Sequence, residues 1–182
     1  MTPPIGQDYR GMPDARLELL LTDAAATEAL GAALARGYAG GMGHGAVVYL
    51  SGELGAGKTT CARSLLRALG VVGLIRSPTY TLVETYAPAG LNCVHVDLYR
   101  LASPLEVEEL GLRDDLAGEC LMLVEWPERG GAVLPPADLE VTLSYQDRGR
   151  GAQLEAHTER GRHWLELLHN DASLISYVSN MT

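Results

Sequence analysis

Apolar residues near the middle of the chain form continuous runs that alternate with segments of helical spacing. Residues 46–52 and 120–126 are almost entirely apolar, which is typical of strands buried on both faces of a sheet. After the first run, residues 61–69 place leucines on one side of a helix, and Gly70 ends it. This alternation of strands and helices predicts an α/β fold.

The flanking segments show shorter patterns. Residues 139–145 and 151–157 alternate with period two around Asp147-Arg148-Gly149, which predicts an antiparallel hairpin. The other elements are expected in this order: a strand at 17–21, a helix capped by Thr22 or Asp23 and ending at Gly37, strands at 81–87 and 91–97, an acidic helix with a turn at 104–116, and a last helix at 162–169.

Length and composition set the domain limits. The 182 residues, 47% of them hydrophobic, fit one globular domain. Residues 1–15 contain three prolines, two glycines and no apolar period, so we expect a poorly ordered terminus. The ordered domain is predicted to span residues 16–170, which leaves residues 171–182 as a tail without an assigned role.

Composition also narrows the function classes. No run reaches the roughly 18 to 20 apolar residues of a membrane span, and the start lacks an export signal, so we expect a soluble, cytoplasmic protein without membrane contact. The three cysteines and five histidines lack ligand spacing and predict no metal site made by protein alone. The net charge of −9 disfavours direct nucleic-acid binding, which depends on neutralising phosphates. Four arginines lie close together in the sequence and form either a local basic patch, which could bind nucleic acid, or solvated side chains on a hairpin and at a helix start: Arg148, Arg150, Arg160 and Arg162.

Residues 52–59, GELGAGKT, match the phosphate-binding loop pattern G-x-x-x-x-G-K-[ST] at every fixed position, between a strand and a helix. Glycines let backbone N–H groups point at phosphate oxygens, and the helix adds the positive end of its dipole. Lys58, expected on an exposed loop, supplies a cation for the β and γ phosphates, and the Thr59 hydroxyl can bind Mg²⁺. The alternative is a glycine-rich turn with an incidental lysine. ATP is the expected nucleotide, because no [NT]-K-x-D guanine-reading segment is present.

A P-loop enzyme also needs a carboxylate at the end of a neighbouring strand, which holds Mg²⁺ directly or through water. Glu125 follows the apolar residues 121–124, and Asp97 follows residues 94–96. Both are therefore expected at the sheet edge where Lys58 lies. The alternative for Asp97 is a turn or cap residue, which aspartate favours in any case.

Residues 77–81, SPTYT, form a hydroxyl-rich stretch between the loop and the carboxylates, where P-loop enzymes keep a segment that senses the γ-phosphate. The same residues fit an ordinary Ser-Pro turn that enters a strand. Trp126, directly after Glu125, is one of two tryptophans, and such a residue packs in a core or an interface in most chains. No arginine can be named as one that stabilises a transition state.

These segments together resemble a known family. Five segments follow one another in the order and spacing of the TsaE family, bacterial ATPases of tRNA threonylcarbamoyladenosine biosynthesis. They are GELGAGKTT, SPTYTL, HVDLYRL, EVEELGLRD and LVEWPERG. The resemblance covers about residues 22–156. It implies a three-layer P-loop NTPase fold with a mixed, mainly parallel sheet. It also implies a role beside two partner proteins, TsaB and TsaD, which modify adenosine 37 of tRNAs that read codons starting with A. The tRNA is then contacted only indirectly, through that assembly.

By the same resemblance, the ATP cycle acts on the TsaB and TsaD assembly, and Mg-ATP is the molecule bound. Tyr80 falls in the switch-like segment. The residues carried over by motif as catalytic are Lys58, Asp97, Glu125, Thr79 and Trp126, and those carried over as Mg²⁺ ligands are Thr59, Glu125 and Asp97. Nucleotide contacts are expected from Leu54, Gly55, Ala56, Gly57, Lys58, Thr59, Thr60 and Gly149.

Three other functions share the phosphate loop. A small-molecule kinase usually has an arginine-bearing lid, and no arginine-rich segment lies between Thr81 and Glu125. A GTP-dependent regulatory switch should carry the missing guanine-reading segment. A structural subunit with a vestigial loop is opposed by the intact lysine, threonine and carboxylate set.

Overall fold

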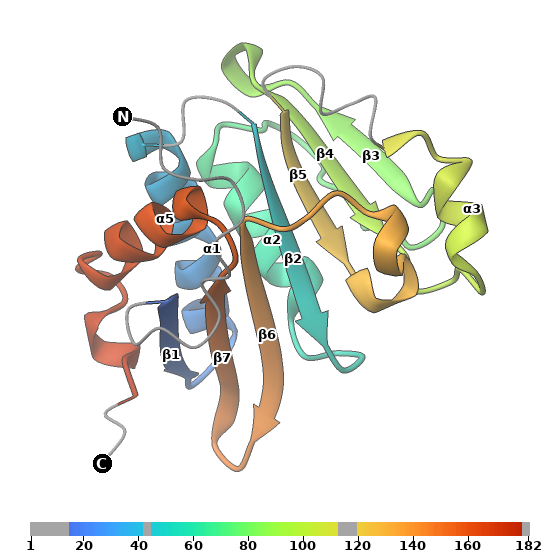
Figure 1. The fold of residues 1–182 in the computed structure, drawn as a ribbon. Helices are drawn as coiled ribbons and strands as arrows, with labels where there is room; N and C mark the ends of the chain where they lie inside the picture. The colour runs from blue at the N-terminus through green and yellow to red at the C-terminus, as the bar shows by residue number, and fades with distance from the viewer. Residues whose placement is uncertain (1–14, 42–44, 113–119, 180–182) are drawn as a thin grey trace.

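The computed structural model describes residues 15–41, 45–112 and 120–179 (Figure 1). Within these residues, seven strands form one sheet in the order β1-β7-β6-β2-β5-β4-β3. The strands are β1 (Arg16–Leu21), β2 (Ala46–Gly52), β3 (Val83–Tyr86), β4 (Asn92–Asp97), β5 (Cys120–Glu125), β6 (Leu139–Gln146) and β7 (Gly149–Ala156). The helices are α1 (Ala24–Gly41), α2 (Lys58–Ala68), α3 (Pro104–Glu108) and α5 (Glu159–His169).

The centre of the sheet is parallel. β2 pairs in parallel with β6 on one side and with β5 on the other, and β5 pairs in parallel with β4. The outer pairs β1–β7, β6–β7 and β3–β4 are antiparallel. This confirms the predicted α/β fold with a mixed sheet and a C-terminal hairpin, whose turn is Asp147-Arg148. Carboxyl ends of β2, β4 and β5 therefore meet at one edge.

Two apolar layers cover the sheet. Leucines of α1 and α2, together with Trp164 of α5, pack on one face with inward residues of β1, β2, β6 and β7. On the other face, Val107 of α3 and Leu134 pack with Val94 and Met122. Both β2 and β5 are thus buried from both sides, as their continuous apolar sequence requires. The result is the predicted three-layer arrangement.

Helix α1 is longer than expected. It passes through Gly37 and ends at Gly41, because Gly37 is a packing position and not a helix stop. A Cβ at Gly37 would lie 2.7 Å from the Trp164 ring, and the Trp164 indole donates to the Leu34 carbonyl. The prediction of a stop at Gly37 was wrong, since the residue that requires glycine there is distant in sequence.

The acidic segment forms a shorter helix than expected. Helix α3 has five residues, begins with a capping box between Ser103 and Glu106, and gives way to a turn in which Gly111 has φ 66°. Residues 113–116 of the predicted element lie outside the described residues. Helix α5 begins at Glu159, earlier than predicted, because the Thr158 hydroxyl accepts from the Gly161 N–H and caps it.

Residues beyond α5 pack on the domain. Leu174 is fully buried in the larger core, and the Ser179 N–H donates to the Glu18 carbonyl at the edge of β1. Arg36 of α1 donates two hydrogen bonds to Asp171, at 2.9 and 3.0 Å. These bonds lower the pKa of Asp171 below its usual 3.8. The contact therefore stabilises the fold above about pH 4 and is lost as the pH falls through that lowered pKa. No role was assigned to this tail from the sequence, and it covers an edge strand.

Among the helices in the described part of the chain, none has the length and apolar character that a bilayer span requires.

Candidate functional site

The loop after β2 curls around a small space at the carboxyl edge of the sheet. Gly52 has φ 127°, and a Cβ there would lie 2.0 Å from the Leu143 carbonyl oxygen of β6. Gly57 has φ 112° and is the N-cap of α2. Since glycine has no side chain with which to cap the helix, the first N–H groups of α2 are left to bind an anion.

Lys58 lies inside this loop. It is 3% exposed, and its Nζ donates to the carbonyls of Gly52, at 2.6 Å, and Glu53, at 2.8 Å. The same Nζ lies 3.7 Å from the centroid of the Trp126 ring. Burial lowers the pKa of Lys58, against the attraction of nearby carboxylates, Glu125 first. The expectation of an exposed loop lysine was wrong: the loop folds over its own lysine.

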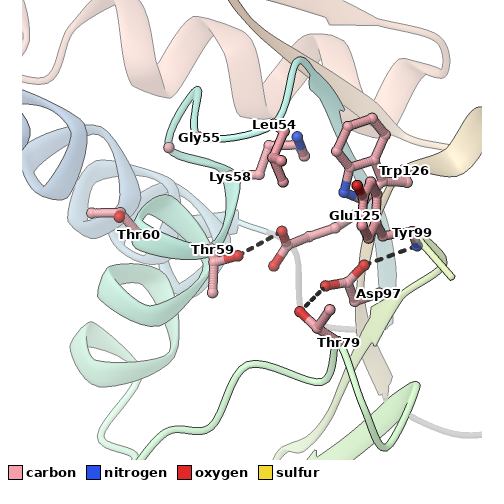
Figure 2. Close-up of a pocket in the computed structure, with 11 residues that line it drawn as sticks. Leu54, Gly55, Lys58, Thr59, Thr60, Thr79, Asp97, Tyr99, Glu125 and Trp126 are labelled. Carbon is pink, nitrogen blue, oxygen red and sulfur yellow. Dashed lines mark hydrogen bonds between the residues drawn. The ribbon is translucent and has the colours of Figure 1, made fainter.

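Two carboxylates end adjacent parallel strands beside the loop. Glu125 ends β5 and Asp97 ends β4, and the two residues are paired in register. They are 2% and 3% exposed. The Thr59 hydroxyl donates to Glu125 Oε2 at 2.7 Å, as Figure 2 shows. The Thr59 hydroxyl and the Glu125 carboxylate of β5, the neighbour of β2 in the sheet, thus already point at each other.

A buried histidine contacts the same carboxylate. His95 of β4 is fully buried, and its Nε2 lies 2.9 Å from Glu125 Oε1. The sequence interpretation missed this residue. The available signal was its place two residues before Asp97, because alternate residues of a strand face the same side of a sheet.

Residues 77–81 contact the other carboxylate, Asp97. The Thr79 hydroxyl donates to Asp97 Oδ2 at 2.6 Å (Figure 2). It also lies 2.8 Å from the Ser77 hydroxyl. Tyr80 is 81% exposed, and the Arg100 guanidinium lies over its ring at 3.9 Å. The segment that the sequence marked as switch-like therefore contacts the end of β4 through Thr79 and the turn after it through Tyr80.

Trp126 adopts a conformation that is rare for a bulky residue. Its φ of 60° and ψ of 50° are left-handed, and its N–H donates to the Leu50 carbonyl of β2 at 3.2 Å. Its ring lies 5.0 Å from the Tyr99 ring, and the Tyr99 N–H donates to Asp97 Oδ1 at 3.0 Å. Tyr99 was not predicted as a site residue. It connects the carboxylate at the end of β4 with the aromatic ring beneath Lys58.

These residues enclose a cleft of about 220 Å³. That volume is below the roughly 300–1,000 Å³ of drug-sized ligand sites, so the cleft suits a phosphate chain better than a whole nucleotide. The lining residues are Leu54, Gly55, Gly57, Lys58, Thr59, Thr60, Thr79, Asp97, Tyr99, Glu125 and Trp126, shown in Figure 2.

Two predicted nucleotide contacts lie outside this lining. Ala56 belongs to the loop itself and is fully buried. Gly149 packs against β1, where a Cβ would lie 2.3 Å from the Leu21 carbonyl oxygen. The hairpin reaches the loop through other side chains: the Tyr145 hydroxyl donates to the Leu54 carbonyl at 2.9 Å, and Arg150 lies 3.4 Å from the Gly55 carbonyl. Nucleotide contact by Ala56 and Gly149 stays a prediction.

The side chains at this site could bind Mg²⁺ only together with phosphate groups. Within the described residues, no group of three or more His, Cys, Asp or Glu side chains is arranged to hold a metal. Mg²⁺ is commonly bound through one or two carboxylates together with substrate phosphates and water. A partly buried hydroxyl, Thr59, and a buried carboxylate, Glu125, beside a phosphate-binding loop match that pattern.

The arginines noted in the sequence do not form one patch. Arg150 contacts the phosphate loop, at the carboxyl end of β2. Arg160 donates to the Gly45 carbonyl, at the opposite end of β2, and lies 3.8 Å from Asp138. Of the two explanations that the sequence left open, the structure therefore favours separate arginines on the hairpin and at the start of α5.

Comparisons with known proteins give a family match and a structural match. A family model described as "Threonylcarbamoyl adenosine biosynthesis protein TsaE" matches residues 21–153. A Haemophilus influenzae protein named tRNA threonylcarbamoyladenosine biosynthesis protein TsaE is 46% identical over 124 residues, 68% of this chain and 78% of that protein. A Synechocystis protein of the same name is 41% identical over 122 residues, 65% of this chain and 74% of that one. The crystal structure of Bacillus subtilis YdiB matches with a TM-score of 0.71 and 27% identity, covering 86% of this chain and 97% of YdiB.

Proposed function

Because this chain belongs to the TsaE family of threonylcarbamoyladenosine biosynthesis proteins, we propose that it binds and hydrolyses Mg-ATP in support of a TsaB and TsaD assembly. That assembly would form threonylcarbamoyladenosine at position 37 of tRNAs that read codons starting with A. The observation that carries the proposal is the partly buried Thr59–Glu125 hydrogen bond next to Lys58, in a loop shaped for phosphate.

The loop and α2 would hold the phosphate chain. Backbone N–H groups of residues 54–59 and the positive end of the α2 dipole attract the phosphate oxygens. Lys58 exchanges its bonds to the Gly52 and Glu53 carbonyls for the β and γ phosphates. Since its ammonium already lies within the cleft, this exchange needs only a small movement of the side chain.

Thr59 and Glu125 would hold Mg²⁺ between them, with Asp97 at the next position along the edge. An ion held there would supply positive charge beside the phosphates. Thr79 and the Tyr99 N–H hold Asp97 in place through one oxygen each, and the remaining lone pairs of those oxygens could accept from a water. Thr79 connects that carboxylate to the γ-phosphate side of the cleft.

The composition of the cleft lining supports the proposal that partner proteins activate ATP hydrolysis. Among the described residues that line it, none is an arginine. Arg100 stacks on Tyr80, and Arg129 donates to the Leu101 carbonyl. Supplying a missing arginine or ordering a switch segment accelerates P-loop enzymes by roughly 10³–10⁵. We therefore expect slow turnover alone and faster turnover with TsaB and TsaD.

Indirect contact with tRNA is part of the same proposal. The net charge of −9 and the dispersed arginines offer little for binding a phosphodiester backbone. The partners, and not this chain, would then hold the tRNA.

Trp126→Ala is expected to lower the partner-stimulated rate about tenfold, the equivalent of one cation–π contact, while ATP affinity changes little. The variant removes the ring beneath Lys58 and the contact with Tyr99. The measurement is steady-state hydrolysis by wild type and variant, with and without both partners. Full-speed turnover by the isolated wild-type chain, unchanged by the partners, would contradict the partner-coupled function and favour a free-standing ATPase or a small-molecule kinase.

A further inference from the structure

A fully buried histidine on β4, between the antiparallel edge strand β3 and the parallel strand β5, needs an explanation. His95 lies on β4 between Val94 and Val96, and its strand neighbours in register are Glu84 on β3 and Leu123 on β5. Burying a polar ring is unfavourable unless its nitrogens are hydrogen-bonded. The described residues give it one side-chain partner, Glu125.

The direction of the hydrogen bond between the two side chains depends on the protonation of the ring. When Glu125 is ionised its oxygens can only accept, so the contact with Oε1 then requires the Nε2–H form of His95. The other ring nitrogen, Nδ1, is buried and has no hydrogen-bond partner among the described residues. Packing alone does not account for such a ring. Cys93, on the same strand and the same face, is equally buried and fills its place without a polar cost.

The two oxygens of Glu125 are divided between two neighbours. Oε1 accepts from His95 at 2.9 Å, and Oε2 accepts from the Thr59 hydroxyl at 2.7 Å. With Oε1 held from the sheet side, the carboxylate cannot rotate about its last bond without breaking a buried hydrogen bond. Oε2 therefore stays directed at Thr59 and the phosphate loop.

We propose that His95 is a positioning residue that orients Glu125 toward Thr59 and the Mg²⁺ of the bound nucleotide. The inference rests on the proposed Mg-ATP function and adds a residue to it that touches neither nucleotide nor metal. Outer partners of metal-binding carboxylates characteristically matter in this way, and their loss weakens metal affinity or activity by about 10- to 100-fold.

The test compares two amides at position 95. In His95→Gln the side-chain nitrogen lies where Nε2 does and can still donate to Glu125, whereas in His95→Asn it stops short. Cys93→Ala is the matched control for a change in buried volume on the same strand face. Binding of a fluorescent ADP analogue is titrated with Mg²⁺, and each variant is checked by thermal unfolding and by its affinity in EDTA.

We expect His95→Asn to need about 10- to 100-fold more Mg²⁺ than wild type. His95→Gln and the Cys93→Ala control should stay within a few-fold of wild type, with EDTA affinities alike in all four proteins. Equal Mg²⁺ dependence of wild type and a folded His95→Asn would overturn the proposal. If wild type bound the analogue without any Mg²⁺ dependence, the proposed Mg-ATP function would itself be wrong. That result is distinguishable from a failure of the His95 proposal alone.

A measurement on wild type covers the case in which the variants do not fold. In ¹⁵N-histidine NMR, the His95 ring is expected as the Nε2–H form, with a shift that moves when Mg²⁺ is added to the ADP complex. A His95 signal that does not respond to Mg²⁺, while the ADP complex does bind it, would also overturn the proposal.

Discussion

Lys58→Ala is expected to lower ATP turnover by about 10²–10³, the usual effect of removing one donor to transition-state charge. The structure places the ammonium inside the loop, 3% exposed, and none of the other described residues that line the cleft is a lysine or an arginine. The variant also removes the Lys58 hydrogen bonds to the Gly52 and Glu53 carbonyls, of which the Glu53 carbonyl still accepts from the Ala56 N–H. Some loss of thermal stability should therefore accompany the loss of turnover.

Arg67→Ala is the matched control for Lys58→Ala. Arg67 lies in the last turn of the same helix and is exposed, so its loss changes net charge equally without touching the cleft. Its turnover and ATP affinity should remain near those of wild type. Wild-type hydrolysis by a folded Lys58→Ala protein would show that the loop residues 52–59 are not the phosphate site.

Glu125→Gln is expected to lower turnover by about 10²–10³ while ATP binding without Mg²⁺ changes only a few-fold. The amide has the same shape but lacks the charge that holds a cation. It can also no longer accept from both His95 and Thr59 through two equivalent oxygens. Asp97→Asn should likewise damage hydrolysis more than binding, because Thr79 and the Tyr99 N–H hold Asp97 beside the cleft.

Glu140→Gln controls for the loss of a partly buried carboxylate elsewhere in the sheet. Glu140 lies on β6, where Ser51 donates to it at 2.7 Å, and hydrogen bonding from His157 lowers its pKa. Its replacement should affect stability and leave Mg²⁺ dependence unchanged. The assignment of Glu125 would be abandoned if Glu125→Gln and Glu140→Gln had equal turnover and equal Mg²⁺ dependence.

The elements that the sequence predicted well are those whose burial is nearly complete. β2 and β5 are apolar along their length because both of their faces are covered, and that pattern is readable without knowing the neighbours. The phosphate loop was equally readable, since its glycines, lysine and threonine are local requirements. The place of Glu125 and Asp97 at one edge followed from the parallel topology alone.

What the sequence could not give depends on contacts between distant residues. Gly37 continues α1 because Trp164 packs against it, and Lys58 is buried because its own loop folds over it. His95 and Tyr99 are ordinary strand and loop residues until β4 is placed beside β5 and Trp126. Residue type and spacing do not contain these pairings.

Calorimetric titration of the purified chain with ATP, in the presence and absence of Mg²⁺, tests most directly whether this cleft is a Mg-ATP site. We expect one ATP per chain, tighter binding with Mg²⁺, weaker binding of GTP, and loss of the signal in Lys58→Ala but not in Arg67→Ala. Absence of ATP binding to the folded wild-type chain, or equal binding by wild type and Lys58→Ala, would contradict the assignment of the cleft.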